Sequence, residues 1–257
     1  MPATVPIQAA KQTLEIIEAL SRSDGLSISE LASSLDMPKS TAYDYLQTLM
    51  DLEYIVHDDS GYRLGTKFLG IGARRRLQYE LFKTAKPELK RLVDETGEHA
   101  TLVIEEHRMG ILLNTVMGSN AVEVVAHDGT RTYLHTTAPG KAILANLPSE
   151  TVEQILDGYD DDGLPAYASQ TIVSRSALLD DLETIRERGY AIDENEAIDG
   201  MRGLGVPIIR RDDKTVAGAI SIYAPMNRST SVEFEKEISE LLLQAANVIE
   251  LNLSYGP

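Results

Sequence analysis

Residues 25–64 read GLSISELASSLDMPKSTAYDYLQTLMDLEYIVHDDSGYRL, and this segment carries the strongest structural signals of the N-terminal part of the chain. Ser27 stands three positions before Glu30, which is the spacing of a capping box, so a helix is expected to begin here. Pro38 follows a short turn and suits the first position of the next helix, because no amide hydrogen is needed there. The stretch therefore predicts two short helices joined by a tight turn.

A further helix and a hairpin flank this pair. Residues 9–20 carry apolar side chains at helical spacing, and residues 54–64 have the pattern of strand, turn and strand. Three helices followed by a hairpin is the order of a winged helix-turn-helix, whose third helix, here Lys39–Asp51, would lie in the major groove of DNA. The apolar side chains expected to face the core of this domain are Leu14, Ile17, Leu20, Ala42, Leu46 and Leu49.

The third helix and the hairpin offer a surface that suits DNA. The helix begins with free amides, a lysine and two hydroxyls, which can bind a phosphate, and side chains one turn further on can reach base edges. Arg63 in the hairpin could contact the backbone beside the helix. Asp44 opposes this interpretation, unless it reads a cytosine amine or holds a neighbouring side chain, and a helical module used only for protein contacts is the alternative. The expected DNA-binding residues are Ser29, Pro38, Lys39, Ser40, Thr41, Tyr43, Asp44, Gln47 and Arg63.

The same residues carry a resemblance to a known family. Ser29-Glu30-Leu31-Ala32, Met37–Tyr43 and Gly61–Gly65 resemble the DNA-binding half of IclR-type transcription regulators. One departure is Asp44-Tyr45, where many members carry an arginine after the aromatic or hydrophobic position. The resemblance implies that residues 1–65 form a DNA-binding domain.

Charge is distributed unevenly along the 257 residues. The formal net charge is −16, which by itself argues against nucleic acid, because phosphates attract a basic face. Residues 1–76, however, carry 8 basic and 10 acidic side chains, so most of the acidic excess lies in the rest of the chain. Such a carboxylate surface predicts adaptation to a cytoplasm of molar salt, and a halophilic archaeon as the source. An acidic protein from a mesophile is the alternative.

Residues 66–82 are expected to link two domains. Apolar side chains there are mixed with Arg74-Arg75-Arg76, so a helix would carry an apolar seam for a partner chain beside a basic face. In the resembling family this helix joins the domains and helps the DNA-binding halves to dimerise. A solvated connector is the alternative, and the two interpretations are compatible.

Residues 83–257 alternate between helical and strand patterns, which predicts an α+β domain with an antiparallel sheet. Strands are expected over residues 101–105, 110–116, 122–125, 205–209 and 216–223. The resemblance extends over this part, because His135–Ala142, Arg188–Glu196 and Ala219–Pro225 are similar to three signatures of the same family. It implies a GAF/PAS-like domain in which the three segments line a pocket for a small effector.

This pocket has a physical basis in the residues themselves. Gly140 and Lys141 open a helix whose amides and positive end suit a carboxylate or a hydroxyl. Tyr223 stands where the family frequently has a smaller side chain with a hydroxyl, so it is expected to shrink or reshape the pocket. The effector is therefore expected to differ from the small keto acids that some members of the family bind. Other roles stay open: a surface ion pair for Lys141, packing for Ser221 and a turn cap for Asp193. The effector-binding residues implied are Ala138, Pro139, Gly140, Asp193, Gly203, Ser221 and Tyr223.

Several classes of enzyme lack their residues in this sequence. The absence of cysteine excludes disulfides, zinc–thiolate sites and cysteine catalysis. No G-x-x-x-x-G-K-[ST] phosphate loop and no G-x-S-x-G elbow occurs, and residues 200–205, GMRGLG, are expected to form a loop and not a dinucleotide motif. The five histidines show no H-E-x-x-H spacing. His127, Asp128 and His135 could bind a metal in principle, but separate surface or pocket roles are favoured. No catalytic residue, metal or cofactor is therefore expected.

Together these features predict a cytoplasmic transcription regulator without a membrane-spanning segment. It would bind double-stranded DNA at a pseudo-palindromic operator as a homodimer or a dimer of dimers, because one winged helix buries too little DNA for specificity. A small effector, either a metabolite acid or a sugar derivative, would shift the relative placement of the reading heads and so change operator affinity. The alternative is a ligand-binding module that recruits a protein partner through its helical head, without operator specificity.

Overall fold

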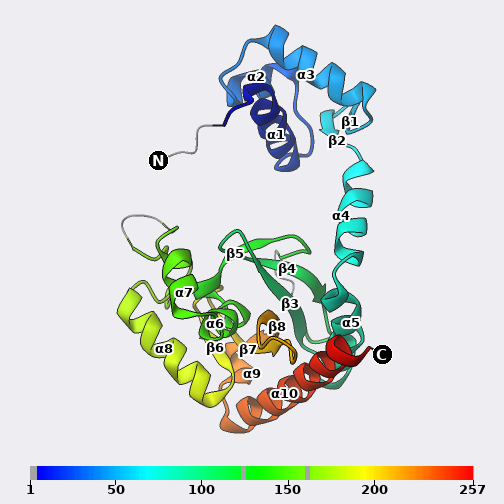
Figure 1. Ribbon diagram of the computed structural model, residues 1–257. Helices are drawn as coiled ribbons and strands as arrows, with labels where there is room; N and C mark the ends of the chain where they lie inside the picture. The colour runs from blue at the N-terminus through cyan, green and yellow to red at the C-terminus, as the bar shows by residue number, and fades with distance from the viewer. Residues whose placement is uncertain (1–4, 123–125, 160–162, 257) are drawn as a thin grey trace. The chain divides into compact units, whose positions relative to one another are not determined.

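The computed structural model describes residues 5–122, 126–159 and 163–256, and the chain divides into two compact units, Met1–Gln78 and Tyr79–Pro257 (Figure 1). The strand expected over residues 122–125 falls largely on residues outside this description. No helix among the described residues combines the length and the apolar composition that a membrane span requires.

The N-terminal unit begins with three helices and a two-stranded hairpin, in the order expected from the sequence. These elements are α1 (Gln8–Ser21), α2 (Ile28–Ser34), α3 (Lys39–Asp51), β1 (Ile55–Asp58) and β2 (Gly61–Leu64). Its core is a single cluster of buried apolar side chains from all three helices and both strands. The winged helix-turn-helix is therefore confirmed.

Local signals set the bounds of α2 and α3. The capping box of α2 is formed: the Glu30 amide donates to the Ser27 hydroxyl, and the Ser27 amide donates to the Glu30 carboxylate at 2.9 Å. Pro38 has an extended ψ of 140°, so it precedes α3 and is not its first helical residue as expected. Its rigid φ still presets the chain for the helix that begins one residue later.

The buried face of α1 differs from the expected one. Leu20 is buried, but Leu14 is 60% exposed, and Ile16 is buried in its place. Two residues apart on a helix point about 200° apart, so Leu14 and Ile16 cannot share a face. The expected face of α3 is correct, because Ala42, Leu46 and Leu49 are all buried.

The linker helix is shorter than the expected segment 66–82. Helix α4 spans Lys67–Leu77 and has no buried residue. Leu81 and Phe82 belong to the next helix, α5 (Glu80–Thr96), and are buried in the core of the second unit.

The C-terminal unit is an α+β domain built on one six-stranded antiparallel sheet, in the order β5-β4-β3-β8-β7-β6. The strands are β3 (His99–Glu106), β4 (Met109–Val116), β5 (Arg131–Tyr133), β6 (Ala191–Glu194), β7 (Met201–Ile209) and β8 (Val216–Pro225). The other elements after α5 are the 3-10 turn η1 (Leu134–Thr136) and the helices α6 (Ala138–Ala145), α7 (Ser149–Leu156), α8 (Arg175–Arg188), α9 (Met226–Ser229) and α10 (Val232–Tyr255).

The two faces of this sheet pack against different helices (Figure 1). Alternate residues of a strand point to opposite faces. Ile220 and Ile222 of β8 accordingly join the core formed with α5 and α10. Ala219 and Tyr223 join a second core formed with α6, α7 and α8. The signature segments expected to meet in a pocket thus come together on the α6 side of the sheet.

The loop expected over residues 200–205 is wrong, because Met201–Ile209 forms strand β7 between β6 and β8. Its glycines allow neighbours to approach closely and do not interrupt the strand. A Cβ atom on Gly203 would lie 2.4 Å from Cε1 of Tyr223, and one on Gly205 would lie 2.6 Å from the carbonyl carbon of Ala138. The glycine spacing therefore reflects packing beneath α6.

Candidate DNA-binding and effector sites

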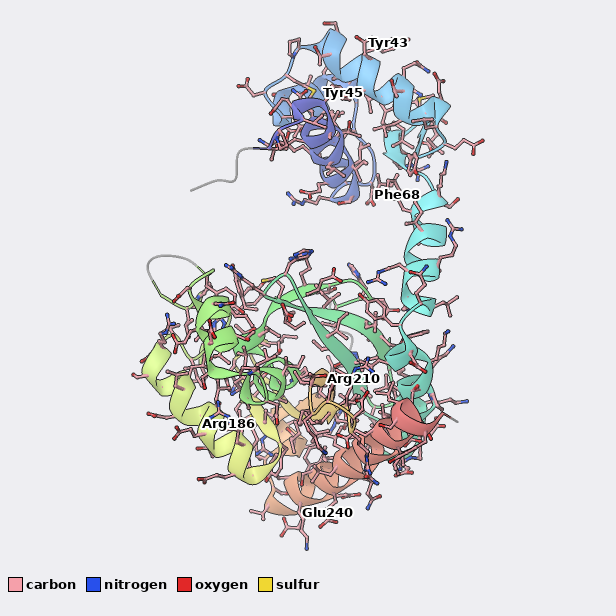
Figure 2. All side chains as sticks on the ribbon, in the orientation of Figure 1. Tyr43, Tyr45, Phe68, Arg186, Arg210 and Glu240 are labelled. Carbon is pink, nitrogen blue, oxygen red and sulfur yellow. The ribbon has the colours of Figure 1, made fainter. Side chains whose placement is uncertain are left out.

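The N-terminal half of α3 presents most of the predicted DNA-binding side chains to solvent. Lys39, Ser40, Tyr43 and Asp44 are exposed, with Tyr43 at 48% exposure. Tyr45 lies on the inner side, where its hydroxyl donates to Oε1 of Gln12 in α1 at 2.8 Å; Figure 2 labels both tyrosines on their helix. Of the other predicted residues, Pro38 and Ser29 are exposed, and Thr41 and Gln47 are half-buried.

Two charged members of this set have different surroundings. The Arg63 guanidinium pairs with the Asp58 carboxylate across the hairpin, so part of its charge is already neutralised. The Asp44 backbone carbonyl accepts from the Thr48 hydroxyl at 2.8 Å, but its carboxylate makes no hydrogen bond or ion pair to another described residue. Among the described residues, therefore, Asp44 does not hold a neighbouring side chain, which was its alternative role.

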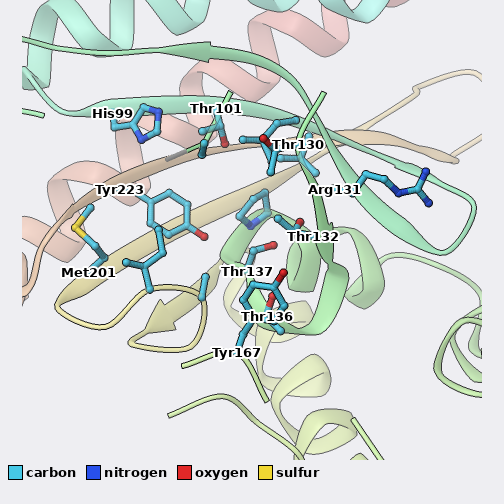
Figure 3. Close-up of a pocket in the computed structure, with 16 residues that line it drawn as sticks. His99, Thr101, Thr130, Arg131, Thr132, Thr136, Thr137, Tyr167, Met201 and Tyr223 are labelled. Atoms are coloured by element: carbon cyan, nitrogen blue, oxygen red, sulfur yellow. The ribbon is translucent and has the colours of Figure 1, made fainter. Parts of the chain in front are cut away.

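The C-terminal unit contains a cavity of about 250 Å³ on the α6 side of the sheet (Figure 3). Its walls come from β3, from the segment leading into α6, and from residues 197–201 before and at the start of β7. The lining residues are His99, Thr101, Val103, Leu112, Ala126, Thr130, Arg131, Thr132, Thr136, Thr137, Pro139, Tyr167, Ala197, Ile198, Met201 and Tyr223.

The hydroxyl of Tyr223 lies at the start of α6, next to the Ala138 amide. That hydroxyl accepts from the Ala138 amide at 3.1 Å and donates to Oδ2 of Asp193 at 2.9 Å. Burial raises the pKa of Tyr223 well above its ordinary value, so the phenol stays protonated and keeps donating. Burial also raises the pKa of Asp193 to about 6, although bonds from the Glu196 amide and from Tyr223 oppose the shift. The donor at this helix end is thus already used within the protein.

The predicted effector residues fall into two groups around this tyrosine. Pro139 and Tyr223 line the cavity, whereas the other five do not border it. Ser221 shares a 2.6 Å hydrogen bond with Thr101, and the Gly140 amide donates to the Thr137 hydroxyl at 3.1 Å. Gly203 lies against the Tyr223 ring. Ala138 and Asp193 are the two residues that hold its hydroxyl.

The sequence signatures do not predict the contribution of β3 to the cavity. Alternation along this strand places His99, Thr101 and Val103 on the cavity side, and His99 is the register partner of Tyr223 in β8. His99 is 4% exposed, and its Nε2 has no hydrogen-bond partner among the described residues. Burial lowers the pKa of His99, which favours the neutral imidazole. The alternation along the strand is a signal that the sequence contains, but His99 lies outside the three signature segments.

Lys141 makes a buried ion pair, so the alternative expectation of a surface ion pair is wrong. The residue is 1% exposed, and its Nζ donates to Oε1 of Glu196 at 2.6 Å and to Oδ2 of Asp181 at 2.9 Å. Burial raises the pKa of Glu196 to about 7, with the ammonium of Lys141 opposing the shift. The network ties α6 to α8 and to the segment that supplies Ala197 and Ile198 to the cavity wall.

The described residues include no group of three or more His, Asp or Glu side chains placed to hold a metal ion.

Two family models match this chain. The model described as the bacterial transcriptional regulator IclR C-terminal domain matches residues 77–251, and the IclR helix-turn-helix domain matches residues 9–59. Together they span both units.

Individual proteins of the same kind match over nearly the whole length. The probable HTH-type transcriptional regulator ArcR of Halobacterium salinarum is 35% identical over 96% of this chain and 94% of its own. The crystal structure of the Thermotoga maritima IclR has a TM-score of 0.80 and 28% identity, covering 96% of this chain and 99% of its own. An IclR homologue from Microbacterium hydrocarbonoxydans, solved with 4-hydroxybenzoate, has a TM-score of 0.80 and 24% identity, covering 95% of this chain and 98% of its own.

Proposed function

The chain belongs to the IclR family of DNA-binding, effector-responsive transcription regulators, and from this we propose that α3 reads a pseudo-palindromic operator while a small acid bound in the C-terminal cavity changes operator affinity. The observation that carries the proposal for α3 is its exposed N-terminal face. Lys39 and Ser40 stand at the helix start, where a phosphate is favoured, and Tyr43 is exposed one turn further on. We assign phosphate contacts to the first turn and base contacts to Tyr43 and Gln47.

We propose that the active form is a homodimer, with a dimer of dimers as the second possibility. One recognition helix reads a short half-site. A two-fold symmetric dimer presents two such helices and therefore reads two half-sites. Helix α4 supports this proposal because it buries none of its residues within the chain, and Leu69 is 73% exposed. A partner copy would cover this apolar side chain, together with Ile71 and Leu77, which are also exposed.

The C-terminal cavity is our proposed effector site. We propose that a ligand in this cavity biases one of two placements of the DNA-binding heads, which is a population shift. The Microbacterium neighbour, which binds 4-hydroxybenzoate, supports an acid of ring size in this fold. Tyr223 supports the same conclusion, since it takes the α6 amide that a small keto acid would otherwise use.

The relatives are named regulators, and we propose that this chain likewise regulates transcription and catalyses no reaction. We propose that it acts in the cytoplasm, where its DNA target would lie. The acidic surface and the relative from Halobacterium salinarum support a halophilic source.

Operator binding by a double variant tests the assignment of α3. Lys39→Ala combined with Gln47→Ala is expected to weaken binding to the selected operator by about tenfold or more, because one phosphate contact and one base contact are lost. Fluorescence anisotropy in potassium chloride at fixed concentration measures the affinity. Lys11→Ala is the matched control, since it removes an exposed cation from α1 of the same domain.

Effector binding to the double variant should equal that of the wild type. Undiminished operator affinity in the double variant would show that α3 is not the reading face. A similar loss in Lys11→Ala would show that the effect is one of overall charge.

A further inference from the structure

His99 lies in the wall of the cavity. It carries a buried nitrogen that has no hydrogen-bond partner among the described residues. Its side chain is 4% exposed and lines the cavity, and Nε2 makes no hydrogen bond to the described residues. Burying a polar atom without a hydrogen-bond partner is costly, so a ligand group that bonds to this nitrogen gains more than it would from a nitrogen that is already bonded.

The other polar groups that reach this cavity from the sheet and from α6 are already bonded within the protein. Thr101 bonds to Ser221 at 2.6 Å, and the Tyr223 hydroxyl bonds to Ala138 and Asp193. The remaining threonines of the wall also have partners. Thr130 accepts from the His127 amide and Thr137 accepts from the Gly140 amide. Thr132 donates to the Gly110 carbonyl at 3.5 Å, and Thr136 donates to the Tyr133 carbonyl. Among the described residues that line the cavity, His99 is therefore the one with a buried polar side-chain atom that has no hydrogen-bond partner.

Arg131 supplies a positive charge at the rim. It begins β5, is exposed, and makes no ion pair with another described residue. Figure 3 shows His99 and Arg131 toward opposite ends of the group of lining side chains. The cavity thus offers a neutral hydrogen-bonding group at one end and a cation at the other.

The walls between these two ends are largely apolar. They comprise Val103, Leu112, Ala126, Ile198, Met201 and the ring of Tyr223. The volume of about 250 Å³ lies just below the roughly 300 Å³ at which pockets for drug-sized ligands begin, which suits one compact ring. A sugar acid would place several hydroxyls against apolar atoms, where they would lose their bonds to water.

We propose that His99 and Arg131 determine specificity for a compact aromatic hydroxy acid, whose carboxylate faces Arg131 and whose hydroxyl, across the ring, hydrogen-bonds to Nε2 of His99. The inference rests on the proposed function in one respect, namely that this cavity is the effector site. The low pKa of His99 agrees with a neutral partner for a hydroxyl.

Calorimetric titration of the full chain in molar potassium chloride tests the roles of His99 and Arg131 at the two ends of the cavity. The probes are 4-hydroxybenzoate, benzoate, 4-hydroxybenzamide and gluconate. The wild type is expected to bind 4-hydroxybenzoate more tightly than the other three. The variant His99→Leu should lower the affinity for 4-hydroxybenzoate by about fivefold and the affinity for benzoate by less than about twofold. Only 4-hydroxybenzoate loses a hydrogen bond in this variant.

The two remaining variants separate hydrogen bonding from packing and charge. His99→Gln keeps a hydrogen-bonding side chain and should retain part of the preference for the hydroxy acid. Arg131→Gln should lower the affinity for both aromatic carboxylates by only about threefold, since the ion pair is exposed. The affinity for 4-hydroxybenzamide, which has no carboxylate, should stay unchanged. His107→Gln, at an exposed turn, is the control and should change nothing.

The proposal is overturned if gluconate binds as tightly as the aromatic acids, if no aromatic acid binds, or if His99→Leu weakens benzoate and 4-hydroxybenzoate equally. Operator affinity is measured on the same preparations without added acid. Intact operator binding with no binding of aromatic acids refutes this inference alone, whereas loss of operator binding in the wild type refutes the proposed function.

Discussion

Lys141→Met is expected to lower the free energy of unfolding by about 3–5 kcal/mol at pH 8, the cost of removing one partner from a buried ion pair. The methionine nearly fills the space of the lysine stem, so the loss reflects charge and not a cavity. Glu196 would keep a carboxylate in a buried position, with one of its oxygens already lacking a partner among the described residues. Asp181 is more exposed and would recover contact with water.

The loss should shrink as the pH falls. Burial raises the pKa of Glu196 in the folded protein to about 7, above the ordinary value of 4.5, so the folded state binds more protons than the unfolded state between these values. Stability associated with this group is present below pH 4.5 and is lost as the pH rises toward 7. Removing the Lys141 ammonium raises this pKa further, so the variant should lose more stability between pH 6 and pH 8 than the wild type.

Chemical denaturation at pH 6 and pH 8 measures both effects. Lys141→Met combined with Glu196→Gln should be more stable at pH 8 than the single variant, because no buried carboxylate then lacks its cation. Lys90→Met, at an exposed position of α5, is the matched control and should change stability little. Equal stability of Lys141→Met and the wild type at pH 8 would contradict a buried network.

Gly205→Ala is expected to destabilise the C-terminal unit by about 3 kcal/mol, at the upper end for overpacking. The new Cβ would lie 2.6 Å from the Ala138 carbonyl carbon and 2.7 Å from the Pro139 nitrogen. Both atoms are backbone at the start of α6, so no side-chain rotation relieves the clash. Strand β7 or helix α6 would have to move, and the hydrogen bond between the Ala138 amide and Tyr223 would be disturbed.

Thermal unfolding and tyrosine fluorescence measure this effect. Gly72→Ala in α4 is the control, because a Cβ atom added there would meet no described atom within 4 Å, and alanine favours a helix. A Gly205→Ala protein as stable as the wild type would mean that α6 does not lie this close to β7.

The N-terminal domain can be predicted from sequence because local signals determine it. The capping box at Ser27 and the apolar spacing of α3 act within a few residues, and the structure confirms both. The predicted face of α1 is wrong at Leu14 because this helix is apolar on more than one side, and only packing against the rest of the domain selects Ile16.

The C-terminal site depends on contacts between distant segments, which local patterns do not encode. The spacing of Gly203 and Gly205 suggests a loop, but their function is to admit the Tyr223 ring and the start of α6. Lys141 looks like a surface residue until Glu196 and Asp181 are brought to it from other elements. The role of His99 requires the register of β3 with β8, which sets it beside Tyr223.

Operator reading by α3 is tested most directly by selection of genomic DNA fragments with the purified 257-residue protein in molar potassium chloride, followed by sequencing. We expect enrichment of one inverted repeat, with half-sites separated as two-fold related recognition helices require. The combined change Lys39→Ala and Gln47→Ala is expected to abolish this enrichment. A folded protein that enriches no sequence would contradict the assignment of an operator-reading regulator.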